Sequence, residues 1–334
     1  MAVILTEPIK SEVAWAGADM SRSDVWRYRI SDSVLGEIDL ALKRIKARGL
    51  AIEQVTKEDF SIPAFAADLA KIAHELEHGR GFVQMKGFPV GRYDEHETAL
   101  AFWGMGTHLG RALSQNAKGE LLGHVRDEGL DIEGGDVRAY QTRVGQGFHT
   151  DIGADVVGLI CLRPAKSGGR SRVVSSMAIY NALLRRYPWH VGVLYSDFAV
   201  DWRGEQPPGD PPVYREPIYA FYDGRLSCRF APRLIRSAQV KTAVSLSPVQ
   251  VETLAVMEQL AEELSFEIDF EPGDIQFINN YVVLHGRTGY EDHAEPARRR
   301  HLLRLWLTVP NARTLPPEFA NGRARGGVPL RTQA

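Results

Sequence analysis

The sequence has little cysteine and almost no net charge. Its 334 residues include two cysteines, Cys161 and Cys228, and each lies in an apolar, strand-like stretch. Buried free thiols are the expected state of such residues, rather than a disulfide or a catalytic role. The formal net charge of -2 gives no general reason to expect nucleic acid or an anionic membrane as a partner. Partners of those two kinds are therefore not expected.

The chain also lacks a long apolar run, an internal repeat and a flexible linker. The apolar run near its start, Ala2 to Leu5, is broken by Glu7 and Pro8, and no later run is long enough to cross a bilayer. We therefore expect a cytoplasmic protein. The absence of a Pro/Gly/Ser-rich stretch in the middle favours a single domain over residues 1–334. Its expected parts are a helical N-terminal elaboration over residues 1–80, a core over 81–319 and a tail over 320–334.

What the sequence does have is helical periodicity in its first part and short β-rich runs after about residue 140. Helices are expected at residues 33–48, 61–78, 93–109, 177–187 and 248–264. Strands are expected at residues 81–87, 156–162, 172–175, 218–222, 226–230, 266–270, 275–279 and 301–309. The turn Asp223-Gly224 joins two of these runs and is typical of a β-hairpin. An α+β fold follows, with strands that form a sandwich or barrel.

The segment Phe148-His149-Thr150-Asp151 offers an imidazole and a carboxylate two residues apart. On a strand, where side chains alternate between faces, His149 and Asp151 would point the same way and could share one metal ion. A third ligand must come from elsewhere, and His285 follows an apolar run far downstream. Two histidines and one carboxylate form the facial triad of non-haem iron oxygenases. Either half of this pattern alone would be weak evidence.

A second histidine pattern occurs in the expected helix at residues 61–78. His74, Glu75 and His78 satisfy the H-E-x-x-H pattern of zinc peptidases. The pattern lies at the end of the helix beside Gly79, and no third ligand follows at the expected spacing. A zinc hydrolase is therefore kept as an alternative function, and a solvated last helical turn is the favoured interpretation.

An arginine-rich segment follows His285 and fits an anionic co-substrate. If that co-substrate is 2-oxoglutarate, its distal carboxylate needs a fixed cation, for which a bidentate arginine is suited. On a strand Arg300 and Arg304 would share one face. A buried arginine without an anion is costly, so an inward Arg300 predicts a carboxylate ligand. The neighbouring Arg299 remains a competitor for this role.

These motifs together resemble the TauD/TfdA-type family of Fe(II)/2-oxoglutarate-dependent dioxygenases, within the clavaminate synthase-like superfamily. The resemblance runs from about Gly81 to Phe319. It covers Gly81-Phe82-Val83, Gly87-Phe88-Pro89, Ser114-Gln115-Asn116, Gly123-His124-Val125-Arg126-Asp127, His149-Thr150-Asp151, Gly168-Gly169-Arg170-Ser171, Pro272-Gly273-Asp274, Asn280 with His285-Gly286-Arg287, and the arginine strand. The ordered series is much more specific than any one motif.

The resemblance implies a fold, a metal and a reaction. The fold would be a double-stranded β-helix, or jelly roll, with N-terminal and inserted helices. His149, Asp151 and His285 match the family's iron ligands, and the cofactors would be Fe(II), 2-oxoglutarate and O2. The reaction would be hydroxylation of an unactivated C–H bond of a small molecule, with release of succinate and CO2. Relatives that halogenate replace the carboxylate ligand with a small residue, so Asp151 disfavours halogenation.

The resemblance also implies residues that hold the co-substrate. Arg300 matches the arginine that pairs with the far carboxylate of 2-oxoglutarate, and Ser171 stands where the family often has a threonine that contacts the same carboxylate. Arg304 matches a second arginine near the iron-side carboxylate or the substrate. Gln141 and Arg143 would continue the strand face of the metal pair and are the expected substrate contacts.

Several alternatives remain open at this point. A desaturase or cyclase would use the same iron, and the ligands do not distinguish it from a hydroxylase. A β-sandwich binding protein without turnover is a non-enzymatic alternative. The substrate and the oligomeric state, a homo-oligomer included, are not readable from the sequence. The loop at residues 203–212, rich in glycine and proline, is expected to be irregular and to lie over the mouth of the barrel.

Overall fold

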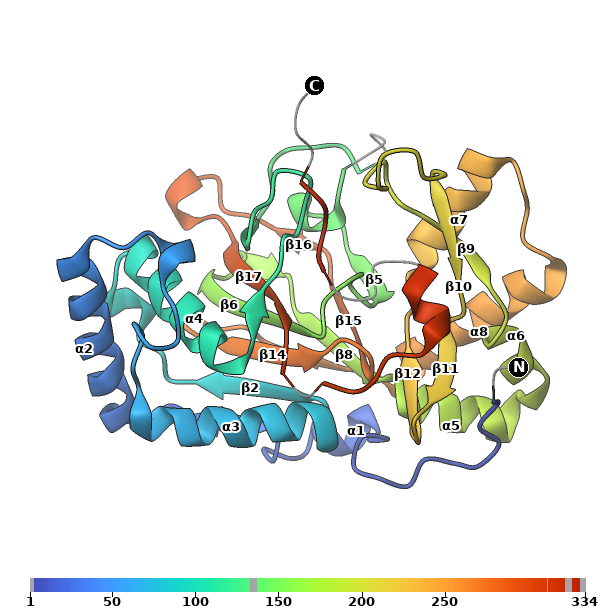
Figure 1. Cartoon of the computed structure of the whole chain (residues 1–334), viewed down its shortest axis with the longest axis horizontal. Helices are drawn as coiled ribbons and strands as arrows, with labels where there is room; N and C mark the ends of the chain where they lie inside the picture. Colours follow the sequence, from blue (N-terminus) through green and yellow to red (C-terminus); the bar gives the residue numbers. More distant parts are fainter. Residues whose placement is uncertain (1–2, 133–136, 311, 322–325, 331–334) are drawn as a thin grey trace.

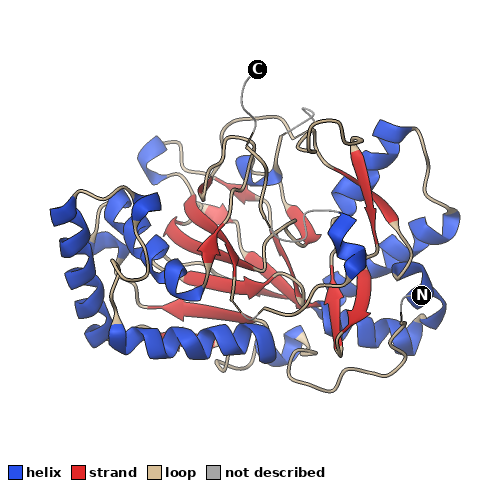
Figure 2. Cartoon of the chain, in the orientation of Figure 1, coloured by secondary structure: helices blue, strands red, loops and turns tan. Residues whose placement is uncertain are grey.

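Two β-sheets lie at the centre of the molecule, and helices flank them on both sides (Figure 1, Figure 2). The structure is a computed structural model that describes residues 3–132, 137–310, 312–321 and 326–330. Cys161 and Cys228 are both buried and free, as expected. In the described part of the chain, no helix combines the length and the apolar character needed to cross a membrane.

The larger sheet has the strand order β1-β2-β14-β6-β17-β3, and β4 also pairs with β17. Its strands are β1 (Arg27–Arg29), β2 (Phe82–Lys86), β3 (Arg111–Ala112), β4 (Leu122–Val125), β6 (Val156–Arg163), β14 (Ile275–Asn279) and β17 (His301–Thr308). Neighbouring strands run antiparallel except β1 and β2. The central strands come from distant parts of the sequence, so contacts between distant residues define this sheet.

The smaller sheet has the order β13-β8-β15-β5 and is antiparallel throughout. Its strands are β5 (Gln146–His149), β8 (Ser171–Ser175), β13 (Phe266–Ile268) and β15 (Val283–Arg287). Three two-stranded ribbons complete the β-structure: β7 (Ser167–Gly168) with β16 (Tyr290–Glu291), β9 (Phe198–Asp201) with β10 (Val213–Glu216), and β11 (Tyr219–Tyr222) with β12 (Arg225–Cys228). The chain thus has the expected α+β fold with a jelly-roll core.

The helices form two groups, one beside each sheet. They are α1 (Gly17–Met20), α2 (Asp32–Arg48), α3 (Pro63–His78), α4 (Glu95–Leu109), α5 (Ser176–Arg186), α6 (Pro188–Leu194), α7 (Pro232–Thr242) and α8 (Pro248–Leu264). Figure 1 shows α2, α3 and α4 gathered at one end of the molecule and α5 to α8 at the other. Helices α3 and α4 pack on the larger sheet, whereas α5 and α8 pack on the smaller one.

Local signals explain where the long helices begin and end. The Ser31 side chain accepts a hydrogen bond from the Val34 N–H at the start of α2, and Gly49 ends that helix with a φ of 63°. Helix α8 starts with a capping box between Ser247 and Gln250, and Pro248 occupies its first turn. These helix ends agree with the sequence prediction because each is fixed by residues within one turn.

Strand β17 divides the molecule into a core side and a site side. Leu303, Leu305 and Leu307 are buried in the cluster that includes residues of α2, α3 and α4. Residues of the opposite parity, Arg304 and Trp306, line a cavity instead. The period of two in the strand therefore places its charged residue opposite the helix-covered core, as the sequence predicts.

Several elements differ from the sequence prediction. Strand β1 lies within the first 80 residues, where only helices were expected, and α7 and the ribbon β9-β10 were not predicted. The expected tail over 320–334 is only partly described, because residues 322–325 and 331–334 lie outside the described residues. Its described stretch packs against the body, since Val328 is buried and its N–H donates to the Ser114 carbonyl at 2.8 Å.

Candidate metal centre and active site

His149, Asp151 and His285 converge at one point, and one ligand atom from each lies within 4.8 Å of the others. His149 and His285 are direct cross-strand partners on β5 and β15. The Asp151 carboxylate lies 3.9 Å from His149 Nε2 and 3.7 Å from His285 Nε2. The structure therefore brings together all three residues that the sequence predicted as metal ligands, and this donor set suits a divalent transition metal.

The position of Asp151 does not come from strand alternation, as the sequence analysis assumed. Strand β5 ends at His149, and Asp151 lies beyond it. Asn280 holds this turn, because its side-chain oxygen accepts from the Asp151 N–H at 2.9 Å and its amide group donates to the carbonyls of Asp151 and Ala154. Trp306 Nε1 donates to the Asp151 carboxylate at 2.9 Å and orients it.

Backbone contacts fix the tautomer of His149. Its Nδ1 lies 2.9 Å from the Gly147 carbonyl, which can only accept, so Nδ1 carries the proton and Nε2 keeps a lone pair. The Gln146 side-chain amide lies 2.9 Å from that Nε2. A metal ion would take this lone pair in place of the amide. A histidine ring oriented in this way by its second nitrogen is typical of metal ligands.

Burial keeps both imidazoles neutral. It lowers the pKa of His285 to about 3, with added repulsion from His149, and it also lowers the pKa of His149. Burial would raise the pKa of Asp151, but the charge of the nearby Arg304 guanidinium, with the hydrogen bond from Trp306, holds that pKa below its ordinary value. At neutral pH the three groups thus present two lone pairs and one negative charge, which is what a divalent cation requires.

A small cavity of about 50 Å³ adjoins His149 and His285, between the two sheets. Its polar lining consists of Gln146, His149, Ser171, Gln276, His285, Arg287, Arg300, Arg304 and Tyr140. Arg300 is buried, its Nη1 has no hydrogen-bond partner among the described residues, and none of their carboxylates forms an ion pair with it, although its guanidinium lies over the Tyr290 ring and Asp292 attracts it. Burial accordingly lowers its pKa. An unpaired, buried guanidinium of this kind fits an anionic ligand in the cavity.

Ser171 and Arg304 are both buried within the same cavity. The Ser171 hydroxyl donates to Gln276 Oε1 at 3.1 Å. Arg304 Nε donates to Gln115 Oε1 at 2.7 Å, and the Gln115 amide donates back to the Arg304 carbonyl at 2.8 Å. Arg299 points elsewhere, because its side chain is exposed and donates to the Ala294 carbonyl.

The structure does not bring Gln141 and Arg143 to the cavity. Gln141 belongs to the short 3-10 helix at Ala139–Gln141, and its side chain donates to Glu128 at 2.9 Å. Arg143 is exposed and pairs with Asp127 at 2.9 Å. The strand that would have carried them inward begins only at residue 146, so the alternation does not extend back to these positions.

The H-E-x-x-H segment at the end of α3 is not a metal cluster among the described residues. Glu75 pairs with Arg80 at 2.7 Å and is thereby engaged. A second group of possible ligands, Glu95, His124 and His301, lies at another edge of the larger sheet. There the Arg163 guanidinium donates to His301 Nδ1 at 3.1 Å, and His301 Nε2 is 2.8 Å from His124 Nδ1. A guanidinium thus occupies the place where a cation would bind.

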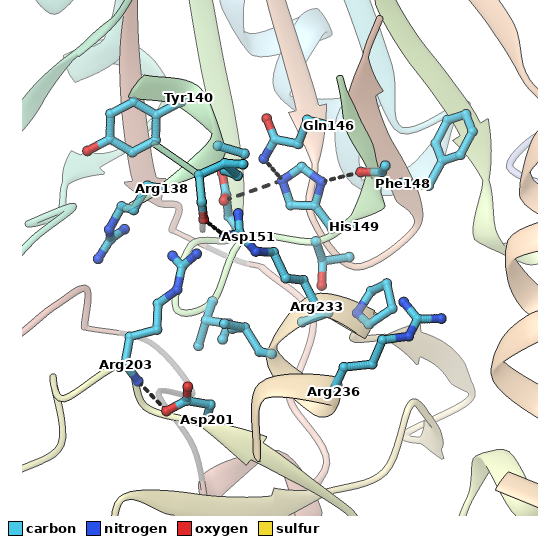
Figure 3. Close-up of a pocket in the computed structure, with 18 of the residues that line it drawn as sticks. Arg138, Tyr140, Gln146, Phe148, His149, Asp151, Asp201, Arg203, Arg233 and Arg236 are labelled. Carbon is cyan, nitrogen blue, oxygen red and sulfur yellow. Dashed lines mark hydrogen bonds and ion pairs between the residues drawn. The ribbon is translucent and has the colours of Figure 1, made fainter. Parts of the chain in front are cut away.

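Most of the walls around the predicted metal ligands were not foreseen from the sequence. A cavity of about 580 Å³ opens beside them, and Figure 3 shows arginine side chains around it, among them Arg138, Arg203 and Arg233. Trp306 could have been found, because it shares a strand face with Arg304. Arg233 follows Pro232 at the start of α7, and a proline at a helix start is a signal that the sequence does carry. Arg138 has no comparable local signal.

Comparisons with known proteins agree with this geometry. The model of the taurine catabolism dioxygenase TauD, TfdA family matches residues 46–306. FR-33289 synthase of Streptomyces rubellomurinus is 32% identical over 329 residues, which is 97% of each chain. The taurine hydroxylase-like protein SAT17 of Stachybotrys chartarum is 29% identical over 316 residues, 91% of this chain and 80% of that protein.

Solved structures share the fold at low sequence identity. An asparagine oxygenase in complex with Fe(II), 2S,3S-3-hydroxyasparagine and succinate matches with a TM-score of 0.64 at 15% identity, over 84% of this chain and 93% of that one. The non-heme iron oxygenase OrfP in complex with Fe, succinate and (3S)-hydroxy-L-Arg matches with a TM-score of 0.64 at 13% identity, over 84% and 94% of the two chains. At these identities the likeness concerns the fold alone.

Proposed function

The chain belongs to the taurine catabolism dioxygenase TauD, TfdA family, and from this premise we propose that it hydroxylates an unactivated C–H bond of a small molecule. It is an Fe(II)- and 2-oxoglutarate-dependent dioxygenase. The observation that carries the proposal is the convergence of His149, Asp151 and His285 beside a buried arginine, Arg300, that has no carboxylate partner in the described part of the chain. No observation favours the zinc hydrolase.

His149, Asp151 and His285 are the proposed iron ligands, and they fit the metal because all three present free electron pairs at neutral pH. Iron bound there supplies the oxidation of a C–H bond by O2, coupled to the conversion of 2-oxoglutarate to succinate and CO2. The protein residues supply the position. Asn280 holds the backbone of Asp151, Trp306 orients its carboxylate, and the Gly147 carbonyl holds the His149 ring.

Arg300 is the proposed partner of the far carboxylate of 2-oxoglutarate. Its unsatisfied Nη1 and its burial support this role, because the carboxylate would supply the missing counter-charge. The Ser171 hydroxyl lies in the same cavity and would turn from Gln276 Oε1 to donate to the same carboxylate. Arg304 is proposed to lie beside the iron-side carboxylate, where the Gln115 side chain fixes its guanidinium.

Apolar side chains exclude water from the proposed co-substrate cavity. Val125, Val157, Phe270 and Leu302 line it and are all buried. A dry wall strengthens the attraction between Arg300 and a carboxylate, because the effective dielectric constant falls as water is removed. The residues of this chain thus bind, orient and shield, and the cofactors supply the reactivity.

The test is succinate formation by alanine variants of the proposed ligands. His149→Ala, Asp151→Ala and His285→Ala should each lower the rate of succinate formation from 2-oxoglutarate by about 100-fold or more, because even residues that only support a metal ligand contribute 10- to 100-fold. His124→Ala, which alters the other histidine pair, should retain the wild-type rate. Wild-type succinate formation in any of the three ligand variants would refute the assignment. Analysis of the organic product then separates hydroxylation from desaturation or ring closure.

A further inference from the structure

The 580 Å³ cavity beside the proposed iron ligands has an unusually basic wall. Besides Arg304 of β17, four arginines line it: Arg138, directly before the 3-10 helix at Ala139–Gln141, Arg203, just after β9, and Arg233 and Arg236, in the first turns of α7. Figure 3 shows the guanidinium groups of Arg203 and Arg233 turned toward the same space near Asp151, whereas Arg236 extends to the other side. Carboxylates of the protein balance some of these positive charges and not others.

Two of the four arginines have carboxylate partners within the protein. Arg138 pairs with Glu205 and also donates to the Gln115 carbonyl at 3.0 Å. Arg236 makes two hydrogen bonds to the Glu258 carboxylate, at 2.8 and 2.6 Å. Neither arginine therefore requires an anion from outside.

Two further acidic residues line this cavity, Asp151 of the proposed iron site and Asp201, and Asp201 is also engaged. It is buried, it pairs with Lys241 at 2.8 Å, and it accepts from the Ser237 hydroxyl. It accepts from the backbone N–H of Arg203 at 2.7 Å, but not from that residue's guanidinium. Asp201 thus balances Lys241 and positions the backbone of Arg203.

Arg203 and Arg233 remain without a carboxylate partner in the described part of the chain. The Arg203 guanidinium makes no hydrogen bond there, and burial, with repulsion from Arg138 and Arg233, lowers its pKa to about 10. It is still charged at neutral pH. Arg233 is exposed, and its one hydrogen bond to a described residue goes to the Ile132 carbonyl, at 2.8 Å. Among the described residues, neither of these two guanidinium groups at the cavity has a carboxylate partner.

The N-terminus of α7 adds positive electrostatic potential at the same wall of the cavity. Its N-cap, Ala231, makes no side-chain hydrogen bond, and its first turn contains no acidic residue. Ala231, Pro232 and Arg233 line the cavity, so the positive end of the helix dipole lies at the same wall. The dipole and the two guanidinium groups therefore favour the same kind of ligand.

We infer that the substrate carries a doubly charged oxyanion headgroup, of the phosphonate or phosphate monoester class, and that Arg203 and Arg233 bind this headgroup. This inference rests on the proposed function. Two uncompensated guanidinium groups match two negative charges, and their planar donor pairs fit the oxygens of such a group. A carboxylate or sulfonate supplies one charge and would leave one arginine unbalanced. The far carboxylate of 2-oxoglutarate is assigned to Arg300 in the other cavity, so the two anions occupy separate sites.

The test is anaerobic calorimetric titration of the enzyme loaded with Fe(II) and 2-oxoglutarate. The probes are propylphosphonate, propane-1-sulfonate, butanoate and propan-1-ol, which differ in headgroup charge on a short chain. At a pH above its second ionisation, propylphosphonate should bind at least about tenfold more tightly than either monoanion. Its affinity should rise as pH passes through its second ionisation, whereas that of the sulfonate should not. Equal affinity for propylphosphonate and the sulfonate, or for propylphosphonate and the alcohol, would overturn the inference.

Variants locate the binding site. Arg203→Met and Arg233→Met should each weaken propylphosphonate binding by about 10- to 100-fold, because each removes a charge-assisted hydrogen-bond donor. Arg236→Met, the control, should change it by less than about threefold, because Glu258 already balances Arg236. Undiminished binding in both Arg203→Met and Arg233→Met would contradict the inference.

Binding of Fe(II) and 2-oxoglutarate separates this inference from the proposed function. Both should remain at wild-type affinity in Arg203→Met and Arg233→Met, since these residues lie outside the co-substrate cavity. If the wild-type enzyme binds Fe(II) and 2-oxoglutarate but shows no preference for propylphosphonate, only the present inference fails. If it binds neither Fe(II) nor 2-oxoglutarate, the proposed function fails first.

Discussion

Arg300 and Arg299 are adjacent in the sequence, yet their environments are opposite. Arg300 is buried with an unpaired Nη1, while Arg299 is exposed. The difference follows from the strand that begins at His301, because the residue before it already follows the inward alternation of Arg304. The side chain that the protein buries at a cost in free energy is the one expected to have a ligand.

Arg300→Met should raise the concentration of 2-oxoglutarate needed for half-maximal succinate formation by about 10- to 100-fold, because a charge-assisted pair is lost. The measurement is succinate formed against 2-oxoglutarate concentration. Arg299→Met is the matched control and should leave that concentration unchanged. The opposite pattern would transfer the role to Arg299.

His301 provides a pH dependence of stability away from the proposed iron. Burial lowers its pKa to about 4 from an ordinary value of 6.5, and its neutral ring bonds to Arg163 and His124. Because the unfolded chain takes up this proton first, the free energy of unfolding should fall as pH drops from about 6.5 to about 4. Stability from this group is thus present above pH 6.5 and lost in acid.

Denaturant unfolding at several pH values measures this effect. His301→Gln should flatten the decline between pH 6.5 and 4 relative to the wild type. His96→Gln, at an exposed position, should leave the decline as it is. An equally steep decline in His301→Gln would show that other groups cause it.

At the scale of elements, β17 joins the hydrophobic core to the proposed active site. Leu303 is fully buried against the helices, and Arg304, the next residue, faces the cavities. Packing on one face of the strand therefore determines where the charged groups of the other face lie.

Leu303→Ala should lower the free energy of unfolding by about 2–5 kcal/mol, the usual cost of truncating a buried leucine. Urea unfolding of the iron-free protein measures it. Leu40→Ala, on the solvent side of α2, should change the free energy by about 0.5 kcal/mol or less, since Leu40 is 59% exposed. A loss of about 0.5 kcal/mol or less in Leu303→Ala would contradict the proposal that one face of β17 packs in the core while the other faces the cavities.

Elements with local signals could be predicted from the sequence, and elements fixed by distant contacts could not. Helices α2 and α8 carry their caps within one turn, and the turn at Asp223-Gly224 has positive φ at both residues, as the hairpin signal implies. Strand β5 ends earlier than predicted because Asn280, far along the chain, bonds to the backbone of Asp151. No local pattern contains that contact.

At the scale of the whole molecule, the residues around the proposed iron and co-substrate could be predicted from short-range patterns in the sequence, whereas the arginines of the basic wall could not. The spacing of His149 and Asp151, and the alternation of Arg300 and Arg304, are short-range patterns, and the structure brings these residues together around one point. The basic wall was not foreseen, because Arg203 and Arg233 come from a loop and from a helix that meet only in the folded chain. Gln141 and Arg143 were chosen by extending a strand that the fold does not extend.

The central claim is that one iron ion binds between β5 and β15, and equilibrium dialysis against Fe(II) without oxygen tests it most directly. The wild-type protein should bind one Fe(II) per chain in the presence of 2-oxoglutarate, and Asp151→Ala should lose that site because the only carboxylate of the triad is removed. Retention of one Fe(II) per chain at wild-type affinity in Asp151→Ala would contradict the account.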